Sequence, residues 1–217
     1  LVRFMSEEGE ENPTAESDKS FNTLLRKALL LNVQKTQDIF WNQFLSWYFV
    51  QQRDYGKAFV QEKAIFKRDP DTFYNIVNLA KLAVEENEDA TAREILNFIL
   101  QNTTDPELQM QSYYYLLSMD IKAAQEKDHP AIRQLIDALL SQYGVSPYSL
   151  DLQLLKADFE AFHLKDTGAA IATLNKTLEL QLNKYQQAQV KMKLADVLLL
   201  DEKFNQAIIY YAQIEED

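Results

Sequence analysis

The chain has 217 residues, 47% of them hydrophobic, which is enough to bury the core of one or two domains. It has no cysteine, so disulfides, thiolate metal sites and cysteine nucleophiles are excluded. With 22 basic and 33 acidic residues its net charge is −11, which repels nucleic acid and anionic lipid and disfavours both as partners. Only 4 glycines and 5 prolines interrupt the chain, and this scarcity of turn-forming residues favours an all-α fold.

Residues 1–19 differ from the rest of the chain. Six acidic residues lie between positions 6 and 18 together with Gly9 and Pro13, without an apolar period, and predict a long acidic loop. Residues 1–5 are interpreted as the end of a preceding helix. The first residues turn acidic where a signal peptide is basic and apolar, and the densest apolar stretch, residues 44–50, is too short to span a bilayer. We therefore expect a soluble chain with no targeting segment and no membrane insertion, with the compartment open between cytoplasm and periplasm.

Helical periodicity fills residues 20–217, which we predict to be one repeat domain. Apolar residues recur every three or four positions, and short polar turns separate the segments. The dipeptide Asp69-Pro70 is a strong break, because proline cannot continue a helix and biases the residue before it toward extended geometry. The eleven predicted helices cover residues 20–34, 37–52, 55–68, 71–86, 89–102, 105–126, 130–143, 148–165, 167–182, 184–200 and 203–215.

One pattern repeats along this domain: an apolar helix, a short polar turn, and a second helix opened by a small residue. Its clearest copies lie within residues 42–70, 75–101 and 191–217, and two looser copies lie between them. A single hairpin of this size cannot bury its apolar stripe alone, so about five helix–turn–helix units are expected to stack after a leading helix. The small residues are Ala58, Ala92, Ala131, Ala170 and Ala207, at intervals of 34, 39, 39 and 37 residues.

This period and pattern resemble the tetratricopeptide repeat (TPR) family over residues 21–217. The sequence departs from the family where Ser46, Ala80 and Ala195 replace the glycine that follows the leucine of the first helix. The resemblance implies a right-handed superhelix of stacked antiparallel helical hairpins, a TPR-like α-solenoid. It also implies that the first helices of successive hairpins line a concave groove in which a partner protein binds.

The predicted groove residues are the side chains that the first helices direct away from their packing face. They are Gln43, Trp47, Gln51, Val77, Lys81, Leu116, Asp120, Leu155, Phe159, Phe162, Met192 and Asp196. The Lys and Asn clamp with which chaperone-binding TPR proteins hold a C-terminal carboxylate has no match among them. Apolar and amide groups together predict a scaffold that binds a partner peptide or helix, anchored by Trp47 and Phe159. The aromatic cluster on one helix is interpreted as core between helices; its members are Phe40, Trp41, Phe44, Trp47, Tyr48 and Phe49.

Two other functions stay open. The first alternative is that the protein is an architectural spacer of a longer solenoid, with the groove filled by another part of the same chain or by a second copy. A metal-dependent enzyme is the less favoured interpretation, based on the pairs Glu126/His129 and Glu160/His163, because di-iron bundles present ligands as Glu-x-x-His. The helix break at residues 128–130 is expected to turn His129 out of register. No phosphate loop or hydrolase elbow is present, so we expect no catalysis, no metal and no cofactor.

The last predicted helix leaves an unpartnered flank. A solenoid needs a terminal helix with a polar outer face, whereas Ile209 and Tyr210 make this flank apolar. We therefore expect self-association through Ile209 and Tyr210, and a natural protein that continues with further repeats beyond Asp217. The residues expected to face inward are Phe204, Ala207, Ile208, Tyr211 and Ile214.

Overall fold

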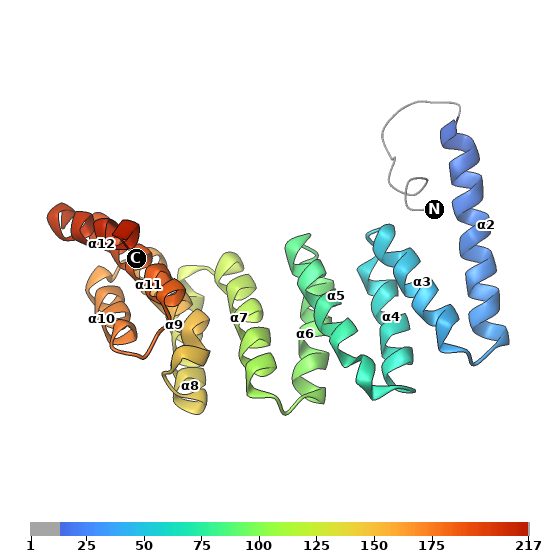
Figure 1. Ribbon diagram of the computed structural model, residues 1–217, viewed down its shortest axis with the longest axis horizontal. Helices are drawn as coiled ribbons and strands as arrows, with labels where there is room; N and C mark the ends of the chain where they lie inside the picture. Colours follow the sequence, from blue (N-terminus) through green and yellow to red (C-terminus); the bar gives the residue numbers. More distant parts are fainter. Residues whose placement is uncertain (1–13, 217) are drawn as a thin grey trace. The chain divides into compact units, whose positions relative to one another are not determined.

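The computed structural model describes residues 14–216, with side chains from residue 20 to residue 214. In this range the regular structure is entirely helical, with eleven α-helices and no strand, which confirms the all-α prediction (Figure 1). None of the described helices combines the length and the apolar character needed to cross a bilayer. The contacts divide the chain into two compact units, Leu1–Ile99 and Leu100–Asp217.

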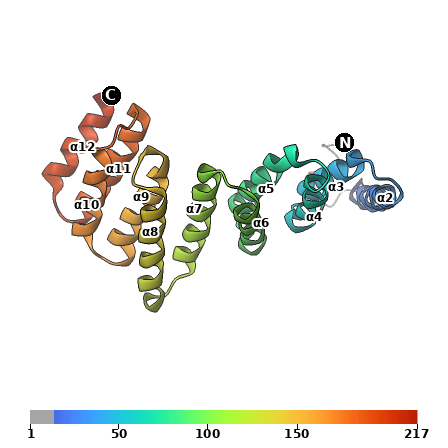
Figure 2. The same cartoon turned by 90° about the horizontal axis from the view of Figure 1, so that it is seen from below.

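The first unit is built around the hairpin of α3 and α4, which lie side by side (Figures 1 and 2). Between them the Ser46 hydroxyl donates a hydrogen bond to the buried carboxylate of Glu62. Helix α4 also contacts α6, where the rings of Phe59 and Phe98 meet edge to face with centroids 5.5 Å apart. The helices of this unit are α2 (Thr14–Lys35), α3 (Ile39–Gln51), α4 (Tyr55–Phe66), α5 (Phe73–Glu85) and α6 (Asp89–Asn102), which ends just beyond it.

The second unit has two adjoining apolar clusters. One joins α7, α8 and α9, with Leu117, Ile136 and Leu152 at its centre, and the other joins α9 to α12 and includes Leu174 and Leu194. A π-helical turn, Phe159–His163, continues α9 and contributes to both clusters. The helices are α7 (Pro106–Ala123), α8 (His129–Tyr143), α9 (Leu150–Asp158), α10 (Thr167–Leu178), α11 (Lys184–Leu200) and α12 (Phe204–Glu216).

With the π-helical turn counted as part of α9, ten of the eleven helices begin and end within four residues of the predicted positions, and α2 is the exception. It starts at Thr14 rather than at residue 20, so residues 14–18 are helical and the loop prediction is wrong there. Residues 1–13, with the rest of the predicted loop and the end of a preceding helix, lie outside the described residues.

Three hairpin turns share one backbone geometry, with left-handed φ angles of 55°, 59° and 59° at Arg53, Asn87 and Glu202. In each turn the amide of the following residue donates to the carbonyl five residues before it, at 2.8 to 2.9 Å. This is the Schellman type of helix end, formed here without the glycine that such turns usually contain. Lys165, with φ of 56°, takes the same place after α9. There the amide of Asp166 reaches six residues back, because the π-helical turn adds one residue.

The small residue of the repeat lies five positions after each of these left-handed residues. Ala58, Ala92, Ala170 and Ala207 are all fully buried, which confirms their predicted role in close helix packing. Ala131 is exposed instead, so the predicted register of that copy is wrong. The turn before it differs, since it is a 3-10 helix with a capping box rather than a Schellman turn.

Candidate functional site

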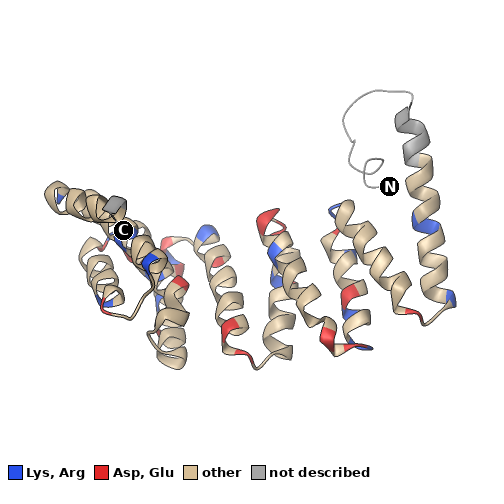
Figure 3. Cartoon of the chain, viewed as in Figure 1, with Lys and Arg blue, Asp and Glu red and all other residues tan. Residues whose placement is uncertain are grey.

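Helix α3 carries no charged residue, and Figure 3 shows it without Lys, Arg, Asp or Glu along its length. Its N-terminus is capped by Asp38, whose carboxylate accepts a hydrogen bond from the amide of Phe40 at 2.9 Å. One face is buried and includes Leu45, Tyr48 and Phe49. In a chain with one charged residue in four, an uncharged helix that keeps a second, partly exposed face is a candidate binding surface.

That second face is a row of aromatic rings, Phe40, Phe44 and Trp47, which we call the aromatic ridge. Phe40 and Phe44 have ring centroids 6.1 Å apart, and Phe44 and Trp47 have centroids 5.6 Å apart. Phe40 is 54% exposed, and the other two are half-buried. The predicted groove residues Gln43, exposed, and Gln51, half-buried, belong to the same helix. The interpretation of this cluster as core therefore holds for Tyr48 and Phe49 but not for Phe40.

Two predicted groove residues are buried, and their placement in a groove is wrong. Val77 is 5% exposed and Phe159 is 1% exposed. In α5 the exposed face passes through Tyr74 and Asn78. The residue of α5 that faces solvent at this point is therefore Asn78, one position after Val77. In α9 the residue next to the buried Phe159 is Asp158, whose carboxylate binds the Lys193 ammonium of α11 at 2.9 Å.

The remaining groove residues keep some access to solvent. Phe162 and Met192 are 53% and 45% exposed, and Asp196 is exposed. The Asp196 carboxylate accepts a hydrogen bond from the Tyr211 hydroxyl at 2.6 Å, which raises the pKa of Tyr211. The half-buried members are Lys81, Leu116, Asp120 and Leu155.

The C-terminal flank is only partly as predicted. Ile209 is 56% exposed, whereas Tyr210 is half-buried against the second cluster. Phe204 and Ile208 were expected to face inward and are instead 57% and 62% exposed. Helix α12 packs through Ala207, Tyr210 and Tyr211, and this rotation turns Phe204 and Ile208 outward.

The two histidines of the Glu-x-x-His pairs lie together, which corrects the expectation that His129 is turned away. Their ring centroids are 5.8 Å apart and the rings are nearly perpendicular. Glu160 does not join them, because it is buried, accepts a hydrogen bond from Thr173 at 2.7 Å and lies 3.8 Å from Lys156. Between residues 14 and 216 no group of three or more His, Asp or Glu side chains has the arrangement of a metal site. The interval of 34 residues between the histidines, equal to the shortest repeat interval, was a signal for this proximity.

No protein-family model matches the chain, and no curated protein is significantly similar to it. The TPR resemblance therefore stays a prediction.

Proposed function

We propose that this protein is a non-catalytic interaction scaffold that binds an amphipathic helix of a partner protein through the aromatic ridge. The observation that carries the proposal is the row Phe40, Phe44 and Trp47 on an uncharged helix. Aromatic side chains supply much of the binding energy in protein interfaces, because they bury large areas at low cost in conformational entropy. The amides of Gln43 and Gln51 add hydrogen-bonding groups to the same helix.

The repeated Schellman turns and the buried alanines that follow them support a TPR-like architecture of stacked hairpins. In that architecture, a right-handed superhelix, α3 is the first helix of a hairpin and so borders the concave side. The ridge spans about 10 Å along α3, which matches two turns of a partner helix that presents apolar residues three and four positions apart. The net charge of −11 favours a partner whose flanking residues are basic.

The test uses a display library of helical peptides selected on the whole protein, followed by titration of the enriched peptides. Both tryptophans of the chain, Trp41 and Trp47, lie on α3, so a change in tryptophan emission locates binding at the ridge. Peptide anisotropy then measures affinity, and Trp47→Ala is expected to weaken binding by about tenfold or more. The control is Tyr148→Ala, which removes a 79% exposed aromatic ring from the second unit and should leave the affinity unchanged. Peptides that bind Trp47→Ala as tightly as wild type would contradict the proposal.

A second candidate function is that of an architectural spacer, and the exposed apolar residues of α12 favour it. Phe204, Ile208 and Ile209 are all more than half exposed, and a second copy packed on them would remove this surface from water. Sedimentation velocity over a wide concentration range should then show a dimer that Ile209→Asp abolishes. Val60→Asp, at a 55% exposed valine of the first unit, is the control. A wild-type protein that stays monomeric throughout would rule out this role for α12.

A further inference from the structure

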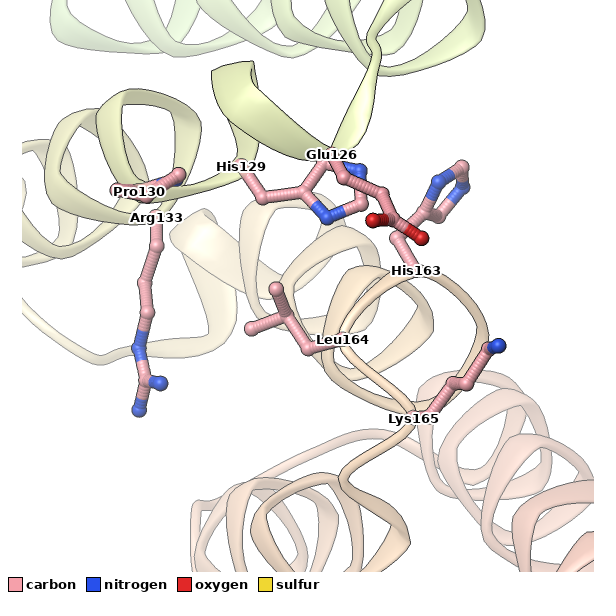
Figure 4. A pocket seen from close by; sticks show the side chains of 7 residues that line it. All are labelled: Glu126, His129, Pro130, Arg133, His163, Leu164 and Lys165. Carbon is pink, nitrogen blue, oxygen red and sulfur yellow. The ribbon is translucent and has the colours of Figure 1, made fainter.

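A cavity of about 460 Å³ lies in the second unit, between the start of α8 and the end of the π-helical turn. Its polar lining consists of Glu126, His129, Arg133, His163 and Lys165. Figure 4 shows the two imidazoles close to Glu126, with Arg133 and Lys165 extending on opposite sides of Leu164. These are the only two histidines of the chain.

The basic side chains of this cavity are not used by the fold. Among the described residues, neither Arg133 nor Lys165 forms a hydrogen bond or an ion pair with another side chain, and neither does Glu126. Two permanent cations without side-chain partners therefore line one cavity, although the chain as a whole carries a net charge of −11. Unpaired guanidinium and ammonium groups offer only donors, so the group that complements them is an anion with several acceptor oxygens.

The two imidazoles are held by the core of the unit. Phe159 is 1% exposed, stacks on His163 with centroids 5.6 Å apart, and meets His129 edge to face at 5.4 Å. The π-helical turn brings Phe159 and His163 into this contact, and such turns occur frequently at functional sites. The left-handed residue Lys165 then reverses the chain at the cavity rim. These ring contacts position both imidazoles, of which His163 is exposed and His129 half-buried.

Glu160 and Asp128 do not line the cavity and have hydrogen-bond partners of their own. Glu160 is bound to Thr173 inside the unit, and the Asp128 carboxylate accepts the amide of Gln125 at 3.0 Å. Glu126 is the single acid in the lining. Arg133 and Lys165 bring two positive charges against this one negative charge, so the lining carries a net positive charge.

We propose that this cavity binds a tetrahedral oxyanion, the phosphate group of a phosphorylated ligand, held by Arg133 and Lys165 with His129 and His163 as further donors. Pro130 and Leu164 give the cavity an apolar part of its wall. The volume of the cavity is far greater than a lone phosphate needs. The apolar wall therefore favours a phosphate ester whose organic part contacts it. The cavity and the aromatic ridge use different residues in different units, so this proposal stands or falls independently of the proposed function.

The experiment follows the histidine ring signals by NMR while sulfate, inorganic phosphate and a phosphoserine peptide are titrated at low ionic strength. Because both histidines line the cavity, saturable shifts of their rings report binding there. Arg133→Gln and Lys165→Gln should each weaken sulfate binding by about tenfold, since each removes a charge-assisted contact. Glu126→Gln should strengthen it, because it removes the only acid in the lining. Lys176→Gln, at an exposed lysine of α10, is the matched control and should change nothing.

The sources of the phosphate are distinguished by the ligands. Tighter binding of the phosphoserine peptide than of inorganic phosphate identifies a phosphate ester, and equal binding identifies the free ion. The proposal is overturned if none of the three ligands produces a saturable shift of either ring. It is also overturned if Lys176→Gln weakens binding as much as Arg133→Gln, since attraction is then diffuse.

Discussion

Replacing Phe159 with alanine is expected to lower the free energy of unfolding by about 3 to 5 kcal/mol. The ring is 1% exposed and belongs to the cluster that joins α7, α8 and α9. Its removal deletes buried apolar area and leaves a cavity that the surrounding helices fill only in part. Denaturant unfolding followed by circular dichroism measures the change.

Phe162→Ala is the matched control, because Phe162 lies in the same π-helical turn and is 53% exposed. It should change the free energy of unfolding by about 0.5 kcal/mol or less. If the two variants lose the same stability, Phe159 does not support the core as described. Phe159→Ala should also alter the ring signals of His129 and His163, since it removes the ring that both contact.

Replacing Ala92 with leucine is expected to destabilise the protein by about 1 to 3 kcal/mol through overpacking. Ala92 has no solvent exposure, and its amide donates to the carbonyl of Glu88 at 2.8 Å in the first turn of α6. Added methylene groups at this close helix contact force the neighbouring backbone to shift. Thermal melts compare the variant with wild type.

Ala90→Leu is the control on the same helix, because Ala90 is exposed and both changes have the same small effect on helix propensity. It should leave the melting temperature nearly unchanged. An Ala92→Leu protein as stable as the Ala90→Leu protein would show that the repeat position tolerates a large side chain, and the close packing inferred from the four buried alanines would be wrong.

Local sequence determined the helices of this protein. Scarce glycine and proline, apolar residues at helical spacing and the Asp69-Pro70 break place ten helices within four residues of their observed bounds, once the π-helical turn is counted with α9. These signals are short in range, because capping residues and helix-breaking prolines act on the backbone within about one turn of their own position. The interval between Ala58 and Ala92 likewise reflects one hairpin geometry that recurs, and both residues are buried as predicted.

The sequence determined less completely which face each helix buries. The predicted exposed face is wrong by one residue in two helices. Val77 and Phe159 were predicted to line the groove but belong to the core, and their neighbours Asn78 and Asp158 are the more exposed residues. One residue is about 100° around a helix, and the choice depends on the elements packed against it. The π-helical turn adds a residue that no apolar period indicates.

Only the tertiary structure brought together the residues that line the cavity between α8 and the π-helical turn. Arg133 and Lys165 are ordinary surface residues in the sequence, and the break at residues 128–130 indicated that His129 points away. The edge-to-face contacts of His129 with Phe159 and with His163 depend on the packing of α8 against α9. A helical period specifies contacts three or four residues apart, whereas a contact across 34 residues exists only once the apolar faces of two helices have been buried against each other.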